Sequence, residues 1–242
     1  MVRHHADRAR YSLKKLLNPF DEEAQRIVNA TQLLGTSRKW NEARDLIELG
    51  RFKDADAVLR EVERTPIIDE LRADIALHVG RNDAAIEMLE EMQTQNGPSA
   101  RIFVKIGDAW NASRQAGKAR ANWLRAAQLE AGADLKSTHR KLADSFAAAG
   151  DNPTALWHRA REHYYVGRDV LKFGYTDKSP THFEAAVLHD SKMAQAWFYL
   201  GEARRLNNQK EPAATAYRTC LKLNPDHGRA LANLAYLEED AK

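Results

Sequence analysis

One spacing of apolar residues recurs along this chain and constrains its fold more than any other feature. A small residue is followed four positions later by a large one and, three positions after that, by a small or medium one. Steps of four and three place side chains on one face of an α-helix, where the small residue lets a partner helix approach closely. The clearest copies are Ala55–Leu59–Val62, Ala85–Leu89–Met92, Ala119–Trp123–Ala126 and Ala213–Tyr217–Cys220.

A second pattern predicts a partner helix before two of these copies. Its residues are Phe103, Ile106, Gly107 and Trp110 before Ala119, and Trp197, Leu200 and Gly201 before Ala213. Gly50, Gly80 and Gly150 each lie five residues before an alanine, as expected of glycines that end one helix and turn the chain into the next. Since Ala85 and Ala119 are 34 residues apart, the patterns together predict a repeat of antiparallel helix pairs.

The stretch from Ala194 to Pro225 resembles the tetratricopeptide repeat, a helix–turn–helix unit of about 34 residues. Six residues stand where that family has W, L, G, A, F and P, namely Trp197, Leu200, Gly201, Ala213, Tyr217 and Pro225, whereas Arg204 and Cys220 depart from the pattern. The resemblance covers roughly residues 36–240. It implies an all-α fold, a right-handed α-solenoid of antiparallel helix pairs in a TPR-like superhelix, whose first helices line a concave groove for a peptide or a partner's helix.

Three parts are expected along the chain. Residues 1–35 form a basic N-terminal helix and a capping helix, residues 36–227 form about five to six repeats, and residues 228–242 form a C-terminal capping helix. Residues 2–17 have apolar side chains at helical spacing among five Lys or Arg residues. We favour a cap for this basic segment, with a membrane-surface or partner-docking helix as the alternative.

The repeat becomes irregular near residues 153–193. Arg159 and Glu162 stand where apolar residues belong. Gly167, Phe183 and Ala186 lie 34 residues before Gly201, Tyr217 and Cys220, a register that would make the helix from Pro153 serve two repeats. We expect a long or broken helix over about 153–172, a loop over 174–179 and a short helix over 180–190 with Ser179 as its N-cap. Such an irregular unit is either a joint or a functional insertion.

Composition and charge narrow the class of protein. The single cysteine, Cys220, allows no intrachain disulfide, and neither a membrane span nor a signal-peptide core is visible, so we expect a cytoplasmic protein. The net charge is +4 over residues 1–20, −7 over 21–100 and +6 over 101–242. This asymmetry can steer a charged partner or favour head-to-tail contact between copies.

The sequence contains no catalytic motif, so we expect neither enzymatic activity nor a cofactor. His158 and His163 are five residues apart and diverge on a helix, while His182 and His189 are about 10 Å apart along one, so no metal site is expected. Trp110, Trp123 and Trp157 are interpreted as packing residues. A basic run keeps RNA binding as a weaker alternative, although helical phase scatters its members: Lys118, Arg120, Arg125, Lys136, Arg140 and Lys141.

The resemblance also implies which residues face the groove: Glu70, Asp74, Arg101, Asp108, Asn111, Arg140, Asp144, Phe198, Glu202, Arg205 and Arg229. Phe198 lies beside Trp197, so we expect it to point away from the core as an exposed contact for a partner. The alternative is that Phe198 packs under the preceding irregular loop. Val104 and Asp108 stand where some family members carry a Lys and an Asn that clamp a chaperone's C-terminal carboxylate, which disfavours that particular function.

We therefore expect a non-catalytic scaffold or adaptor that binds a protein or peptide partner through its concave groove and self-associates through its ends. One alternative is an accessory subunit that recruits substrate to an enzyme complex. The other is the RNA-binding repeat protein. We expect neither a nucleic-acid partner nor membrane contact.

Overall fold

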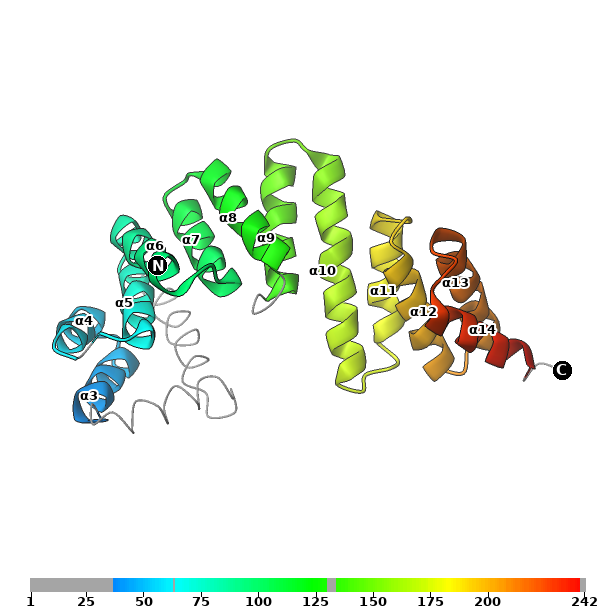
Figure 1. Ribbon diagram of the computed structural model, residues 1–242, viewed down its shortest axis with the longest axis horizontal. Helices are drawn as coiled ribbons and strands as arrows, with labels where there is room; N and C mark the ends of the chain where they lie inside the picture. The colour runs from blue at the N-terminus through cyan, green and yellow to red at the C-terminus, as the bar shows by residue number, and fades with distance from the viewer. Residues whose placement is uncertain (1–36, 63, 130–133, 240–242) are drawn as a thin grey trace. The chain divides into compact units, whose positions relative to one another are not determined.

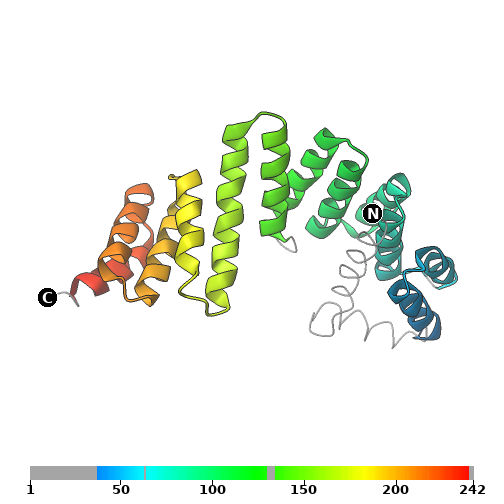
Figure 2. The same cartoon turned by 180° about the vertical axis from the view of Figure 1, so that it is seen from behind.

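The computed structural model describes residues 37–62, 64–129 and 134–239, and every regular element in these ranges is an α-helix (Figures 1 and 2). The predicted all-α class is therefore confirmed. The two helices expected within residues 1–35 lie outside the described residues. The helices are α3 Ser37–Glu48, α4 Phe52–Arg60, α5 Pro66–His78, α6 Asn82–Asn96, α7 Ala100–Ala112, α8 Ala116–Leu129, α9 Leu135–Ala148, α10 Asn152–Lys172, α11 Ser179–His189, α12 Ala194–Leu206, α13 Lys210–Leu223 and α14 Gly228–Glu239.

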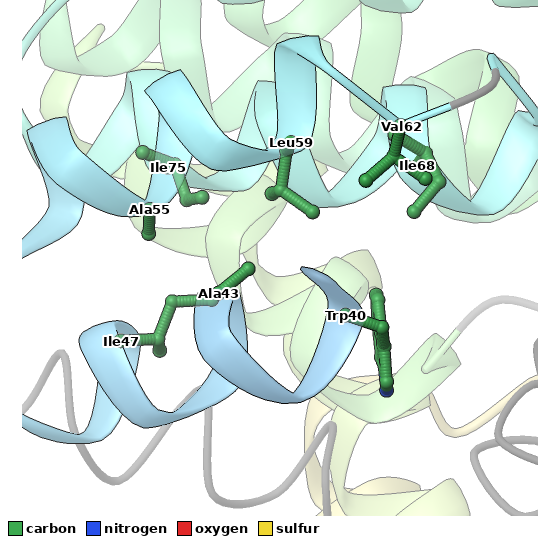
Figure 3. Packing of buried hydrophobic residues seen from close by; sticks show 8 residues of the cluster. All are labelled: Trp40, Ala43, Ile47, Ala55, Leu59, Val62, Ile68 and Ile75. Carbon is green, nitrogen blue, oxygen red and sulfur yellow. The ribbon is translucent and has the colours of Figure 1, made fainter. Parts of the chain in front are cut away.

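The chain divides into two compact units, residues 1–122 and 123–242. In the first unit, α3 pairs with α4 and α5 pairs with α6. Figure 3 shows how α3 turns Trp40, Ala43 and Ile47 toward α4 and α5. The first three copies of the small–large–medium spacing are buried at every position: Ala55, Leu59, Val62, Ala85, Leu89, Met92, Ala119, Trp123 and Ala126. The spacing in the sequence therefore identified the packing face correctly.

The turns between paired helices use a left-handed residue, as the glycines predict. Gly50, Gly80 and Gly150 have φ values of 74°, 77° and 80°. Two equivalent turns carry a side chain instead, with φ 59° at both Arg114 and Asn208. The left-handed conformation ends one helix and reverses the chain within a few residues, which produces the antiparallel pairs.

In the second unit, α10 packs against both α9 and α11, and α12 packs against α13. Gly167 on α10 and Gly201 on α12 have equivalent roles. A Cβ atom added at Gly167 would lie 2.9 Å from the Phe183 ring, and one added at Gly201 would lie 2.5 Å from the Tyr217 ring. The 21-residue α10 therefore serves twice: its first half is the second helix of the α9 pair, and its second half is the first helix of the α11 pair.

The start of α11 and the presence of α14 can be compared with the sequence prediction. The N-cap of α11 is Lys178, whereas Ser179 lies within the helix and donates its hydroxyl to the Thr176 carbonyl oxygen, so the predicted cap was one residue late. The expected helix after Pro225 is present as α14. None of the described helices combines the length and hydropathy of a bilayer-spanning segment.

Candidate functional site

The predicted groove residues of the first unit pair with one another. Glu70 and Asp74 on α5 are buried, and Arg101 on α7 lies 2.5 Å from the Glu70 carboxylate. Lys105, one turn further along α7, lies 2.7 Å from Glu70 and 2.6 Å from Asp74. Burial raises the pKa of Asp74, and the Lys105 ammonium opposes that shift. Two further predicted residues of this unit also lie on α7: Asp108 is part-buried and Asn111 is exposed.

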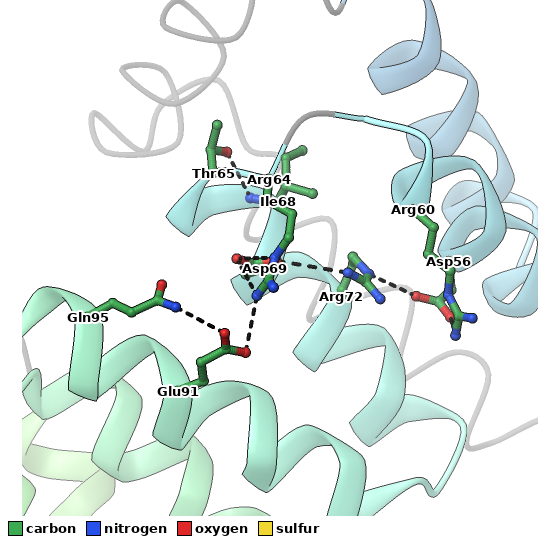
Figure 4. A network of polar contacts seen from close by, with 9 residues as sticks. All are labelled: Asp56, Arg60, Arg64, Thr65, Ile68, Asp69, Arg72, Glu91 and Gln95. Atoms are coloured by element: carbon green, nitrogen blue, oxygen red, sulfur yellow. Dashed lines mark hydrogen bonds and ion pairs between the residues drawn. The ribbon is translucent and has the colours of Figure 1, made fainter.

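A second charge network occupies another part of the same unit. Arg64 lies 3.1 Å from Asp69 and 3.2 Å from Glu91, while Arg72 lies 3.3 Å from Asp56 and 3.9 Å from Asp69. Figure 4 shows these side chains joining α4, α5 and α6. Many carboxylates of the acidic stretch are thus neutralised within the chain, which reduces the negative field available to a partner.

In the second unit, the polar residues that interrupted the repeat pattern form a network of their own. Glu162 is buried and accepts hydrogen bonds from Arg140 at 2.6 Å and Arg159 at 2.5 Å. The other guanidinium nitrogen of Arg159 donates to Asp144 at 2.6 Å. Arg159 and Glu162 therefore replace an apolar contact between α9 and α10 by a set of charge-assisted hydrogen bonds.

Glu202 on α12 is the centre of a similar network. Its carboxylate accepts hydrogen bonds from the Tyr217 hydroxyl and, at 2.5 Å, from Asn233. Arg205 lies 3.5 Å and Arg229 lies 3.9 Å from the same carboxylate. Burial and the Glu202 carboxylate both raise the pKa of Tyr217. These predicted groove residues thus bind one another across α12, α13 and α14.

The expectation that Phe198 is exposed is wrong, because its side chain is 1% exposed. Its ring lies 6.0 Å from the Tyr217 ring and 4.5 Å from the His227 ring, and the Arg229 guanidinium lies 4.9 Å from its centroid. His227 and Arg229 come from the turn before α14 and from its first turn. Phe198 is therefore covered by the segment that follows it rather than by the preceding irregular loop.

A recess of 630 Å³ lies between the start of α9, the second half of α10 and α12. This recess is lined by Asp134, Leu135, Lys136, Tyr165, Arg168, Asp169, Leu171, Lys172 and Tyr199. Two carboxylates of the recess already have partners within the chain. The Lys136 ammonium lies 2.6 Å from Asp169, a hydrogen bond that raises the pKa of Lys136, and Asp134 caps α9 by accepting from the Ser137 amide.

Two cations of the recess have no such partner. Among the described residues, no carboxylate lies within ion-pair distance of Arg168 or Lys172, and both side chains are exposed. The Arg168 guanidinium lies 5.6 Å from the Tyr164 ring and 5.4 Å from the Tyr199 ring, which hold its plane in place. The recess therefore offers two positive groups beside tyrosine rings, an arrangement suited to an anionic group on an extended chain.

Sequence reasoning missed Tyr165, Arg168 and Lys172. A signal existed, since Tyr165 and Arg168 lie 34 residues before Tyr199 and Glu202, in the register of Gly167 and Gly201. The sequence alone does not select this register, because it requires one helix to serve two repeats. The double role of α10 is what turns these residues to the same side as the other first helices.

Aromatic and histidine side chains form a separate cluster between α9 and α10. Trp157 is 44% exposed, contrary to its interpretation as a packing residue, and Arg161 stacks on it at 3.2 Å. His139 and His158 are buried, with their Nδ1 atoms 2.8 Å apart. Across the described ranges no three metal-binding side chains converge. These side chains therefore pack against one another, and the Trp157 ring remains partly exposed.

Comparison with known proteins identifies the class of the repeat. The family model of the tetratricopeptide repeat matches residues 194–227, which span α12 and α13. The chain therefore contains a tetratricopeptide repeat, and the resemblance drawn from its sequence is confirmed. Among curated proteins, the peroxisomal targeting signal receptor of Candida albicans is 32% identical over 82 residues, 33% of this chain and 14% of the receptor. The PEX5-related protein of Mus musculus is 27% identical over 157 residues, 65% of this chain and 26% of that protein. The chain thus spans about a quarter or less of these relatives.

Solved structures that match this chain have low sequence identity and TM-scores below 0.5. The crystal structure of YrrB, described as a TPR protein with an unusual peptide-binding site, is 17% identical with a TM-score of 0.38 and covers 75% of this chain and 96% of its own. MamA from Desulfovibrio magneticus is 11% identical with a TM-score of 0.43, covering 79% of this chain and 96% of its own. The TPR2AB domain of yeast Sti1 is 14% identical with a TM-score of 0.42, covering 85% and 84%.

Proposed function

We propose that this protein is a non-catalytic adaptor that binds an extended acidic peptide of a partner protein in the recess between α9, α10 and α12. The observation that carries the proposal is the pair of exposed cations, Arg168 and Lys172, that lack a carboxylate among the described residues. The recess volume of 630 Å³ lies within the range of about 300–1,000 Å³ typical of ligand sites.

The chemistry of the recess fits a peptide with acidic side chains. Arg168 can donate two hydrogen bonds to one carboxylate, and Lys172 contributes a mobile positive charge one helical turn away. Tyr165 and Tyr199 supply rigid amphipathic surface for the aliphatic parts of the peptide. The matched relatives include a receptor whose name refers to a targeting signal, which supports peptide recognition as the class of activity.

The proposal places this adaptor in the cytoplasm. Cys220 is the chain's one cysteine and is buried as a free thiol, which suits a reducing compartment. The helix pairs support the scaffold role, because buried polar residues such as Glu162 and Glu202 pair within the chain and stabilise the packing of its helices.

The experiment that tests the proposal is selection of binding peptides from a random library, followed by titration of the selected peptides. We expect acidic residues to be enriched in them. The double substitution Arg168→Ser, Lys172→Ser should weaken binding by about tenfold or more, because a hydrogen bond to a charged group contributes roughly 1.5–3 kcal/mol.

The control removes the same charge elsewhere in the same unit. Lys192 and Lys222 are exposed, and the substitutions Lys192→Ser, Lys222→Ser should leave the affinity within about twofold of the parent. Selected peptides without acidic enrichment, or equal loss of affinity in both double variants, would contradict the proposed site.

A further inference from the structure

Helix α14 has the face of a first helix, and no second helix within the described part of the chain covers that face. Ala230 and Leu237 are buried against α13, while Leu231 is 50% exposed and Ala235 is also exposed. Ala235 lies 34 residues after Gly201, which in turn lies 34 residues after Gly167. At those two earlier positions a ring of the following helix packs on the small residue: Phe183 on Gly167 and Tyr217 on Gly201. None of the described helices does so at Ala235.

A helix that covers this face must carry the second-helix spacing. Its small residue permits close approach, the large residue four positions later packs on Ala235, and a medium residue three positions further closes the contact. The basic segment, residues 2–17, contains this spacing as Ala9, Leu13 and Leu16. The second helices α4, α6, α11 and α13 are not available, because each already packs on its own partner.

The charges of the two surfaces are complementary. Residues 1–20 carry a net charge of +4. Helix α14 has no cation after Arg229 and ends in Glu238, which pairs with Arg218 of α13 at 2.9 Å, and in Glu239, at the negative end of its helix dipole. A basic helix placed along Leu231 and Ala235 would bring opposite charges together at the end of α14.

We infer that the basic segment of one copy packs on the Leu231–Ala235 face of α14 in a second copy, and so completes a repeat across two chains. The two contacting surfaces are different, so the contact is head-to-tail. Such an interface extends into an open chain of copies or closes into a ring, and it becomes weaker as salt screens the charges.

A complementation experiment tests this contact on the full chain by sedimentation velocity over a range of protein concentrations. Leu13→Glu damages the basic segment and leaves α14 intact, whereas Leu231→Glu does the reverse. We expect the parent to self-associate, each variant alone to stay monomeric, and an equimolar mixture of the two variants to form a 1:1 complex. Leu188→Glu, at an 81% exposed position on α11, should associate like the parent.

Circular dichroism first establishes that all variants keep the helical content of the parent. A parent that remains monomeric at every concentration overturns the inference, as does self-association of either single variant. A mixture of Leu13→Glu and Leu231→Glu that stays monomeric overturns it too. Loss of association in Leu188→Glu would place the contact elsewhere and is equally contrary.

Discussion

At the scale of single residues, two buried carboxylates have partners on neighbouring helices. Glu70 pairs with Arg101, and Glu202 pairs with Asn233, at the same separation of 31 residues. Removal of one partner would leave a buried carboxylate with fewer compensating contacts, which is destabilising. These residues therefore stabilise the packing of one repeat on the next.

The histidine pair predicts how stability depends on pH. Burial, together with the charges of His158 and Arg161, lowers the pKa of His139 to about 3, and burial with Arg161 lowers that of His158 to about 4. Both values lie below the ordinary 6.5, so the folded state binds fewer protons than the unfolded chain. The contribution to stability is complete above pH 6.5 and is lost as the pH falls toward 4.

Urea unfolding at several pH values checks this prediction. The double substitution His139→Leu, His158→Leu should flatten the decline of the unfolding free energy between pH 6.5 and 4. An unchanged slope in the double variant would show that protonation of other groups controls the acid stability.

At the scale of elements, α10 explains the irregular part of the repeat. One helix of 21 residues packs on α9 with its first half and on α11 with its second, so two repeats share it. The sharing removes one helix and one turn from the array. Because Gly167 faces Phe183 on α11, the next residue, Arg168, points into the recess.

Substitution of the packing glycines tests this arrangement. Gly201→Ala should lower the unfolding free energy by about 1–3 kcal/mol, because its Cβ would lie 2.5 Å from the buried Tyr217 ring, and this overpacking exceeds the gain in helix propensity. Gly117→Ala on α8 meets no atom within 4 Å and should leave stability unchanged or raise it by up to about 1 kcal/mol. Equal effects of the two substitutions in urea unfolding would contradict the close packing.

Helix positions and packing faces could be predicted from the sequence, whereas the exposure of particular aromatic side chains could not. The steps of four and three located Ala55, Ala85 and Ala213 in the core because they depend only on helix geometry. The burial of Phe198 depends on His227, from a segment that packs over it in space, and local spacing carries no information on that. The recess was missed for the same kind of reason, since it needs the shared role of α10.

At the scale of the whole molecule, the two units differ in how their charges are used. In the first unit the predicted groove residues Glu70, Asp74 and Arg101 form closed pairs. In the second unit the recess keeps Arg168 and Lys172 without a carboxylate in the described part of the chain. Partner binding is therefore proposed for the second unit.

Hydrogen–deuterium exchange with and without a saturating selected peptide tests that assignment most directly. We predict slower amide exchange in the second half of α10 and in α12, which border the recess, and unchanged exchange in α3 to α6. Protection confined to α3 to α6, or no protection at saturation, would contradict the account.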